Sequence, residues 1–204
     1  HPDFALHLVR KLIGLVRLNC DQVEENEGFV YGLPGDGVSR YQEVLRPYGV
    51  WGIIAPFNFP FALAANPISA ALLAGNCVVF KPAHQGALTG QLIHEIFVQA
   101  GVPAEAFHIL TGPGAVVGAR IASHPDVGGV TFTGSYAVGM EIYRNREGAP
   151  RPAICELGGK NPTVVSGRAD LDKAAEGLMH GSFGFGGQKC ASTSRARWTR
   201  SAPS

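Results

Sequence analysis

Apolar residues in the central part of the chain fall into short runs, which alternate with longer segments that have helical composition. Short apolar runs bounded by Gly, Pro or Asn are typical of strands buried in a parallel sheet. Such runs cover residues 50–54, 77–80, 107–110, 127–132, 153–157 and 163–165. Helical segments cover residues 61–73, 88–100, 116–123, 136–146 and 170–181. This alternation with short turns predicts an α/β fold with a doubly wound, mostly parallel sheet.

The N-terminal part of the chain has a different pattern. Apolar positions within residues 4–26 recur with the i, i+3, i+4 spacing of an amphipathic helix. Glycine, proline and aspartate within residues 32–37 predict a turn or loop. Residues 41–47 then predict a short strand that could bridge to another element or subunit.

Composition limits the classes of function. The 204 residues allow one large domain or two small ones, and 46% hydrophobic residues with 27 Gly and 14 Pro fit a loop-rich globular protein. A formal net charge of +1 gives no electrostatic reason to expect nucleic acid or an acidic membrane surface as a partner. No uninterrupted apolar run approaches the length of a membrane span. We therefore expect neither nucleic acid nor a membrane as a partner.

The cysteines and histidines show no metal-binding spacing. Cys20, Cys77, Cys155 and Cys190 form no CxxC pair, and the seven histidines form no cluster typical of a metal site. We therefore predict no metal. Unpaired cysteines without a signal peptide favour a reduced, intracellular setting. We expect a cytoplasmic protein, or one of the mitochondrial matrix if the source is eukaryotic.

Two glycine-flanked motifs carry candidate chemistry on either side of the last predicted helix. Glu156 lies in the segment 155–162, and Cys190 follows the segment 186–189. A thiolate is a strong nucleophile, which the ammonium of Lys189 could favour, and a glutamate can activate water. The alternative is that Cys190 is a small buried hydrophobic residue, as isolated cysteines often are.

These motifs belong to a larger set in a fixed order. The set comprises Ala55-Pro56-Phe57-Asn58-Phe59-Pro60, Phe80-Lys81-Pro82-Ala83, Phe132-Thr133-Gly134-Ser135, Glu156-Leu157-Gly158-Gly159-Lys160 and Gly187-Gln188-Lys189-Cys190. Together the motifs resemble those of the aldehyde dehydrogenase superfamily. The segments 57–60, 132–140 and 187–190 further resemble its 1-pyrroline-5-carboxylate (L-glutamate γ-semialdehyde) dehydrogenase branch.

The resemblance implies a Rossmann-like NAD-binding domain with NAD as cofactor, and NADP is not excluded. The implied cofactor-binding residues are Ile54, Phe57, Lys81, Gly114, Gly134, Ser135, Val138 and Leu157. Lys81 would hydrogen-bond ribose hydroxyls, and Ser135 would bind the pyrophosphate, although Ser135 is also a good helix N-cap. His84 stands where the family often has a glutamate that repels a 2′-phosphate, so the choice between NAD and NADP stays open.

The resemblance also implies oxidation of a small aldehyde to an acid through a thioester. Cys190 would be the nucleophile, Glu156 would activate water, and Asn58 would stabilise the oxyanion, although asparagine beside proline is also common in turns. The branch implies L-glutamate γ-semialdehyde as substrate and a role in proline catabolism. Ala191 departs from the serine that the branch often has there. The alternatives are another semialdehyde substrate, or a truncated nucleotide-binding module without catalytic activity.

The resemblance predicts three parts of the chain. Residues 1–48 would form an N-terminal helix and bridging segment, 49–158 the dinucleotide-binding domain, and 159–204 the start of the catalytic domain. Members of the superfamily are longer, so we expect a fragment of a protein that forms a homo-oligomer. The basic, aromatic tail Arg195–Arg200 departs from the family, where β-branched and aromatic strand residues would follow.

Overall fold

The structure is a computed structural model that describes residues 2–144 and 151–199. The chain divides into two compact units, His1–Glu156 and Leu157–Ser204, and each is described by itself. The N-terminal unit begins with α1 (Pro2–Glu25), β1 (Val30–Leu33) and β2 (Tyr41–Val44). It continues through β3 (Val50–Ile54), α2 (Ala62–Leu73), β4 (Cys77–Lys81), η1 (His84–Gly86), α3 (Ala87–Gln99), η2 (Ala104–Ala106), β5 (Phe107–Ile109), η3 (Gly114–Gly118), α4 (Ala119–Ser123), β6 (Val127–Gly134), α5 (Tyr136–Arg144) and β7 (Ala153–Leu157).

A five-stranded sheet with the order β5-β4-β3-β6-β7 forms the centre of the N-terminal unit. Strand β3 pairs in parallel with β4 on one side and with β6 on the other, and β4 pairs in parallel with β5. The chain therefore runs outward from β3 to β5 and then returns to β6, which reverses the strand order beside β3. The α/β fold with a mostly parallel sheet is confirmed, and such reversals are where ligands bind in these folds.

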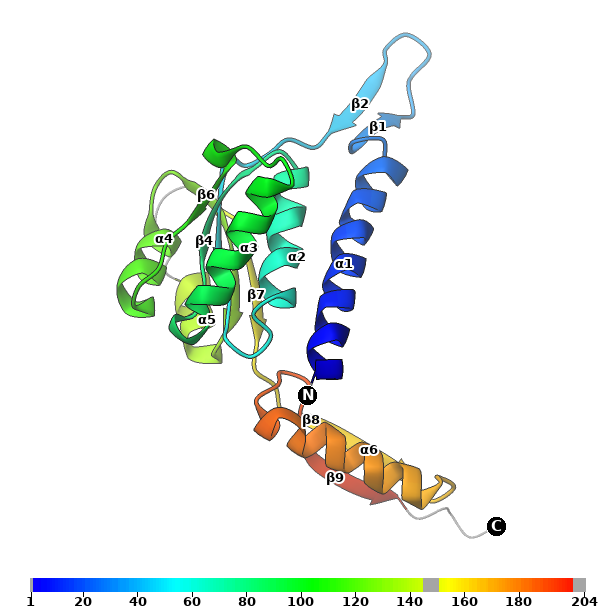
Figure 1. Cartoon of the computed structure of the whole chain (residues 1–204). Helices are drawn as coiled ribbons and strands as arrows, with labels where there is room; N and C mark the ends of the chain where they lie inside the picture. The colour runs from blue at the N-terminus through cyan, green and yellow to red at the C-terminus, as the bar shows by residue number, and fades with distance from the viewer. Residues whose placement is uncertain (1, 145–150, 200–204) are drawn as a thin grey trace. The chain divides into compact units, whose positions relative to one another are not determined.

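Helices cover both faces of this sheet. Figure 1 shows α2 and α3 on one face, and α4 and α5 on the other. Trp51 and Ile53 of β3 are buried in a core cluster with residues of α2 and α3, including Ile68 and Ile93. Gly52 points to the opposite face, where a methyl group would contact Ile121 of α4. Because successive strand residues alternate between faces, the fully apolar run of β3 packs against the helices on both faces of the sheet.

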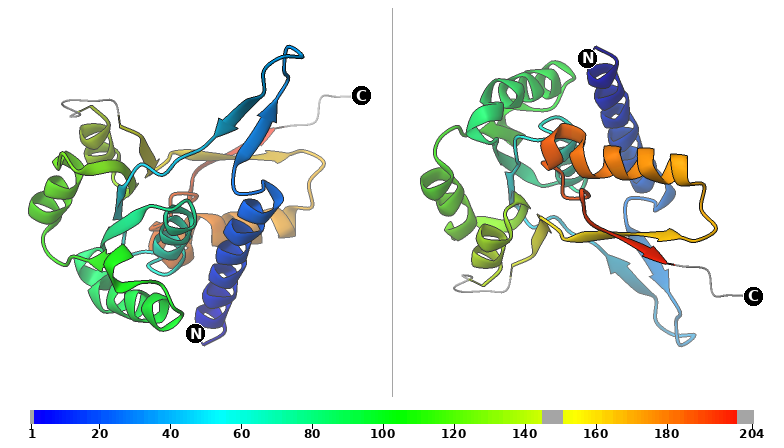
Figure 2. Two further views of the ribbon diagram at one scale, coloured as in Figure 1. Left: turned by 90° about the horizontal axis from the view of Figure 1, so that it is seen from above. Right: turned by 90° about the horizontal axis from the view of Figure 1, so that it is seen from below.

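Helix α1 packs against α2, as Figures 1 and 2 show. The side-chain amide of Asn19 donates to the carbonyl of Asn66 (3.1 Å) and to the hydroxyl of Ser69 (2.8 Å). Strands β1 and β2 then form an antiparallel pair, in which Gly32 lies opposite Gln42. The prediction of a loop from Gly32 onward was therefore wrong by two residues, since that residue and Leu33 belong to β1.

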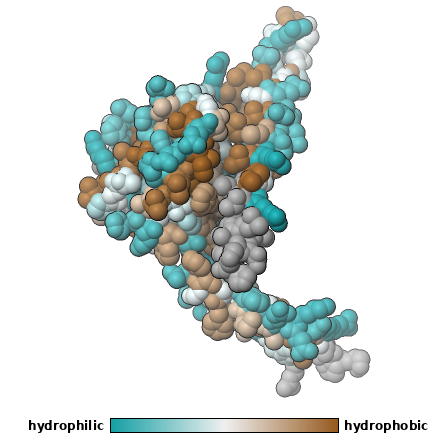
Figure 3. All heavy atoms as spheres, in the orientation of Figure 1, coloured by the Kyte–Doolittle hydropathy of each residue, from teal (hydrophilic) through white to brown (hydrophobic). Residues whose placement is uncertain are grey.

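The outer face of α3 is apolar. Leu88, Leu92 and Ile96 follow one another at four-residue spacing and are exposed by 75%, 44% and 53%. Figure 3 shows apolar side chains gathered over this helix. Ile93 of the same helix is buried in the core, so α3 has apolar residues on its inner and its outer face. None of the described helices is both long enough and apolar enough to cross a membrane.

The C-terminal unit is a strand–helix–strand unit of β8 (Asn161–Ser166), α6 (Leu171–Phe183), η4 (Gly184–Gly187) and β9 (Thr193–Thr199). Strands β8 and β9 are parallel, and Figure 2 shows α6 on one side of the pair. Asp170 is the N-cap of α6, because its carboxylate accepts from the N–H groups of Asp172 and Lys173. The described part of the basic tail forms β9, although its composition departs from the expected strand residues.

Most predicted helices agree with the structure to within a few residues. The predicted segment 136–146 corresponds to α5 (Tyr136–Arg144), and residues 145 and 146 lie outside the described part of the chain. The predicted helix at 116–123 instead begins with a π-helical turn, η3 (Gly114–Gly118), and continues as α4. A single π turn widens the backbone locally and is frequent at functional sites.

Candidate active site

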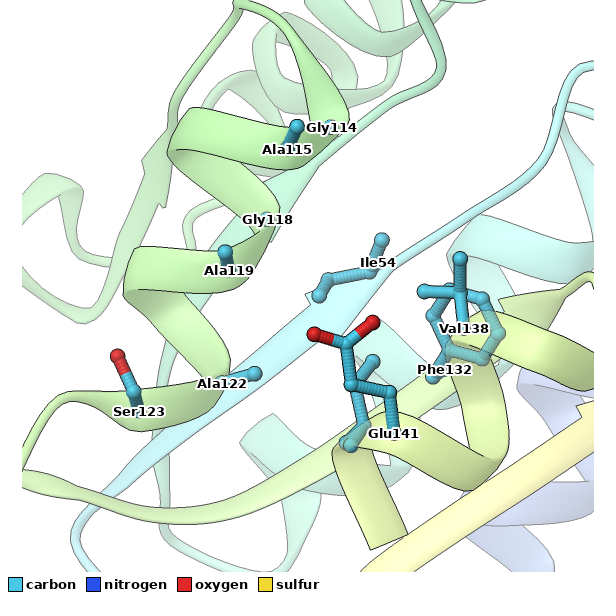
Figure 4. Close-up of a pocket in the computed structure, with 11 residues that line it drawn as sticks. Ile54, Gly114, Ala115, Gly118, Ala119, Ala122, Ser123, Phe132, Val138 and Glu141 are labelled. Carbon is cyan, nitrogen blue, oxygen red and sulfur yellow. The ribbon is translucent and has the colours of Figure 1, made fainter. Parts of the chain in front are cut away.

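A cavity of about 540 Å³ lies on the α4 and α5 side of the sheet, beside the end of β3. Figure 4 shows η3 and α4 on one side of it and α5 on the other. The residues that line it are Ile54, Gly114, Ala115, Gly118, Ala119, Ala122, Ser123, Phe132, Val138, Glu141 and Ile142. This size and apolar lining are typical of small-molecule sites. Three predicted cofactor-binding residues, Ile54, Gly114 and Val138, therefore lie around one cavity.

Lys81 lies next to Gly118, which lines the same cavity. A methyl group placed on Gly118 would lie 3.6 Å from Cδ of Lys81 and 3.9 Å from Cδ1 of Ile54. The lysine is only 3% exposed, and its ammonium donates to the carbonyl of Pro82 at 3.0 Å. Burial lowers the pKa of Lys81, because desolvation disfavours the charged form. A lysine next to an apolar cavity suits a ligand with hydroxyl or phosphate oxygens.

The predicted residues Gly134 and Ser135 lie at the junction of β6 and α5, since Gly134 ends β6 and Ser135 directly precedes α5. A methyl group on Gly134 would meet the ring of Phe132 at 2.5 Å, so any larger residue there would have to displace this ring. The hydroxyl of Ser135 accepts a hydrogen bond from the N–H of Val138 at 3.4 Å. This N-capping contact leaves the hydroxyl hydrogen of Ser135 able to donate to a ligand.

Phe57 and Asn58 follow β3 in the chain. Phe57 is 42% exposed, and the amide oxygen of Asn58 accepts from the N–H of Phe59 at 3.2 Å. That contact turns the oxygen of Asn58 toward its own backbone. The orientation is compatible with a donating role for the amide nitrogen, which stays a prediction.

Glu156 lies on β7 with an exposed side chain, and Leu157 at the end of that strand is half-buried. The sulfur of the preceding Cys155 lies 3.7 Å from the carbonyl oxygen of Gly139 in α5. Because neighbouring strand residues point to opposite faces, Glu156 faces away from α5. Glu156 and Asn58 belong to the N-terminal unit, and Cys190 belongs to the C-terminal unit.

Cys190 is exposed and follows a loop of unusual backbone conformation. Phe185, Gly186 and Gly187 all have positive φ angles of 56°, 63° and 74°. The amide of Asn161 donates to the carbonyl of Cys190 and, at 3.1 Å, to that of Ser192. These contacts tie the backbone at Cys190 and two residues after it to the start of β8.

Lys189 adjoins Cys190 but has a structural contact. Its ammonium donates to the carbonyl of His180 at 3.0 Å, near the end of α6. A cation at this position stabilises a helix C-terminus. This contact does not support the hypothesis that Lys189 favours the thiolate.

Several residues that line the cavity were missed by the motif analysis, above all Glu141. It lies on α5 three residues after Val138 and therefore on the same helix face. That spacing could have indicated it, but only if the facing element, α4, had been known.

Comparison with known proteins gives the family of the chain. The model of the aldehyde dehydrogenase family matches residues 3–202. The chain belongs to the aldehyde dehydrogenase family. It is 46% identical over 149 residues to the alpha-ketoglutaric semialdehyde dehydrogenase of Bacillus subtilis (strain 168), covering 73% of this chain and 30% of the relative. It is 41% identical over 157 residues to the 1-pyrroline-5-carboxylate dehydrogenase of Geobacillus thermodenitrificans (strain NG80-2), covering 74% and 30%.

A solved structure of this family is also similar. The 1-pyrroline-5-carboxylate dehydrogenase from Thermus with bound NAD has a TM-score of 0.71 and 40% identity, over 75% of this chain and 31% of that chain. The five-stranded sheet described above is thus that of an aldehyde dehydrogenase. The chain spans about a third of the length of these relatives.

Proposed function

We propose that the chain supplies the cofactor-binding domain and the nucleophile loop of an NAD-dependent aldehyde dehydrogenase. The observation that carries this proposal is the apolar cavity beside β3, with the buried Lys81 next to Gly118 of its lining. A flat base fits between the small residues of α4 and Val138 of α5, and an ammonium suits the ribose next to it. The NAD bound in the Thermus relative supports the same choice of cofactor.

The proposed chemistry uses one thiol and one carboxylate of this chain. The thiolate of Cys190 attacks the aldehyde carbon, and the amide of Asn58 with the N–H of Cys190 donates to the resulting oxyanion. NAD would supply the hydride acceptor when bound, and loss of a hydride from this carbon would leave a thioester on Cys190. Glu156 then takes a proton from water, which attacks the thioester, releases the acid and restores the thiolate.

We further propose L-glutamate γ-semialdehyde as the substrate. The motif resemblance and the two 1-pyrroline-5-carboxylate dehydrogenases among the relatives support it. A second candidate is α-ketoglutaric semialdehyde, because the Bacillus subtilis enzyme named for it is 46% identical. The two aldehydes share one carbon skeleton and a carboxylate, and they differ by an amine or a ketone beside that carboxylate.

NADH formation by the purified chain tests the function. The expected result is turnover with one of the two semialdehydes that exceeds turnover with propanal and that Cys190→Ala abolishes. A parallel calorimetric titration with NAD separates binding from chemistry. Binding without turnover would support the alternative of a nucleotide-binding module without activity. Failure of the folded chain to bind NAD or NADP would refute the proposed function.

The domain assignment is part of the proposal. Residues 49–158 would bind the dinucleotide, 159–204 would begin the catalytic domain, and 1–48 would form the N-terminal helix and bridging segment. The division of the chain between Glu156 and Leu157 supports a boundary in this region. We also propose that the protein is a cytoplasmic homo-oligomer, which light scattering and cell fractionation would test.

A further inference from the structure

The cavity contains one carboxylate in an otherwise apolar lining. Of the 11 lining residues, only Ser123 and Glu141 have polar side chains. Glu141 lies on α5 one turn after Val138, and Figure 4 shows its carboxylate directed into the space beside Ile54. The side chain therefore faces a ligand site, whereas most glutamates on exposed helices face solvent alone.

No protein group pairs with this carboxylate among the residues whose side chains the structure describes, 10, 13–144 and 151–199. The residue has no hydrogen bond or ion pair in that part of the chain, and this includes Arg144, which lies one turn further along α5. Asp170, at the start of α6, by contrast, has the ammonium of Lys173 at 3.7 Å. The oxygens of Glu141 can therefore accept hydrogen bonds from a ligand.

Two side chains of opposite charge thus lie at or next to one apolar cavity. Glu141 lines it from α5, and the stem of Lys81 lies next to Gly118 of the lining. A matching ligand would have oxygen atoms near the ammonium, a flat apolar body, and a hydrogen-bond donor near the carboxylate. An adenosine group has these features, because its 6-amino group donates two hydrogen bonds at the edge of the base.

We propose that Glu141 accepts a hydrogen bond from the exocyclic amine of the cofactor's adenine and so selects adenine over a 6-keto purine. This inference rests on the proposed function, which places a dinucleotide in the cavity. A 6-keto purine such as hypoxanthine presents an oxygen in place of the amine. The keto oxygen and the carboxylate of Glu141 are both hydrogen-bond acceptors. They therefore repel each other, and the hydrogen bond from the amine is lost.

The expected discrimination follows from the strength of hydrogen bonds to charged groups. For a carboxylate that is partly open to solvent we expect about a tenfold preference, the lower end of the range for such bonds. Glutamine has the same shape, but its amide can either accept from an amine or donate to a keto oxygen. Glu141→Gln should therefore bind both dinucleotides with similar affinity.

The test is a calorimetric titration with NAD and with nicotinamide hypoxanthine dinucleotide, which measures binding without turnover. The proteins are the wild type, Glu141→Gln, Glu141→Ala and the control Glu105→Gln, which changes an exposed glutamate of η2 outside the cavity lining. We expect a tenfold preference for NAD in the wild type and the control, and a ratio near one in both Glu141 variants. Thermal melts would establish that the variants are folded.

Three results would overturn the inference. Equal affinities of the wild type for the two dinucleotides would show that the base edge is not selected. A preference that survives in both Glu141 variants would assign the selection to another group. Failure of the wild type to bind either dinucleotide would refute the proposed function and the inference with it, whereas the first two results leave the proposed function intact.

Discussion

Replacing Lys81 by methionine should make the protein more stable and a poorer binder of NAD. The ammonium is almost fully buried, and its hydrogen bond goes to the neutral carbonyl of Pro82. No carboxylate of the described residues lies within 4.0 Å of it. Methionine keeps an unbranched apolar stem of similar length and removes the charge. The folded state then no longer carries the desolvation penalty of that charge.

The expected change in the free energy of unfolding is the difference between two opposing effects. Replacing a buried charge by a hydrophobic residue of similar volume often stabilises a protein by about 1–4 kcal/mol. Losing the bond to the carbonyl of Pro82 costs about 1.5 kcal/mol. We expect a net gain of about 1 kcal/mol, which corresponds to roughly 2–4 °C in Tm for a chain of this size. Loss of a charge-assisted bond to the ligand should weaken NAD binding by about 10- to 100-fold.

The pH dependence provides an independent check. Because burial lowers the pKa of Lys81 in the folded state, the unfolded chain binds the proton more tightly. The penalty in the wild type is therefore fully present below the folded-state pKa and declines as pH rises from there toward the ordinary value of 10.5. The stability advantage of Lys81→Met should be constant at lower pH and should shrink across that window.

Thermal melts and NAD titrations of the wild type, Lys81→Met and the control Lys160→Met would measure these effects. Lys160 is exposed, so its replacement should change neither Tm nor NAD affinity appreciably. A lower Tm for Lys81→Met combined with unchanged NAD affinity would refute the reasoning, because the ammonium would then stabilise the fold and have no role at the site.

Three further predictions concern backbone positions and a helix cap. Gly14→Ala should stabilise α1 by about 1 kcal/mol, since no atom lies within 4 Å of the added methyl group, and chemical denaturation would show it. Gly128→Ala should destabilise the sheet by about 2–4 kcal/mol, because the methyl group overlaps the carbonyl oxygen of Tyr48; an unchanged Tm would contradict this. Asp170→Ala should destabilise α6 by about 1 kcal/mol, because the helix loses its N-cap, and the helical circular dichroism signal should decrease. Asp170→Asn should retain most of the capping effect.

The strands and helices around the cofactor cavity were predictable because local pattern and burial agree there. The run at Val50–Ile54 is apolar throughout and became the central strand with the predicted bounds. The order of the strands was not predictable, because pairing β3 with β6 joins segments far apart in the chain. Strand β9 was difficult to predict for a related reason. Its arginines disfavour a strand on local grounds, and the strand forms through its pairing with β8.

The residues of the candidate site likewise fall into those that the sequence could predict and those that depend on the tertiary structure. Lys81, Val138 and Cys190 belong to motifs that could be found by residue type and spacing. Glu141 belongs to no motif, and its proximity to the cavity depends on how α5 faces α4. The contact of Lys189 with α6 likewise depends on the path of the loop that contains two left-handed glycines.

The C-terminal unit has few buried apolar side chains, and this affects which part of the molecule unfolds first. Val165 is the one buried apolar residue among the described residues of that unit, whereas the N-terminal unit contains the core cluster around Ile53 and Phe80. Amide protons of α6 and β9 should therefore exchange with deuterium long before those of β3 and β4. The loop that holds Cys190 would be among the first parts of the chain to lose its geometry under mild denaturant, while the dinucleotide cavity persists. Loss of thiol reactivity and loss of cofactor affinity would then be separate events along one titration.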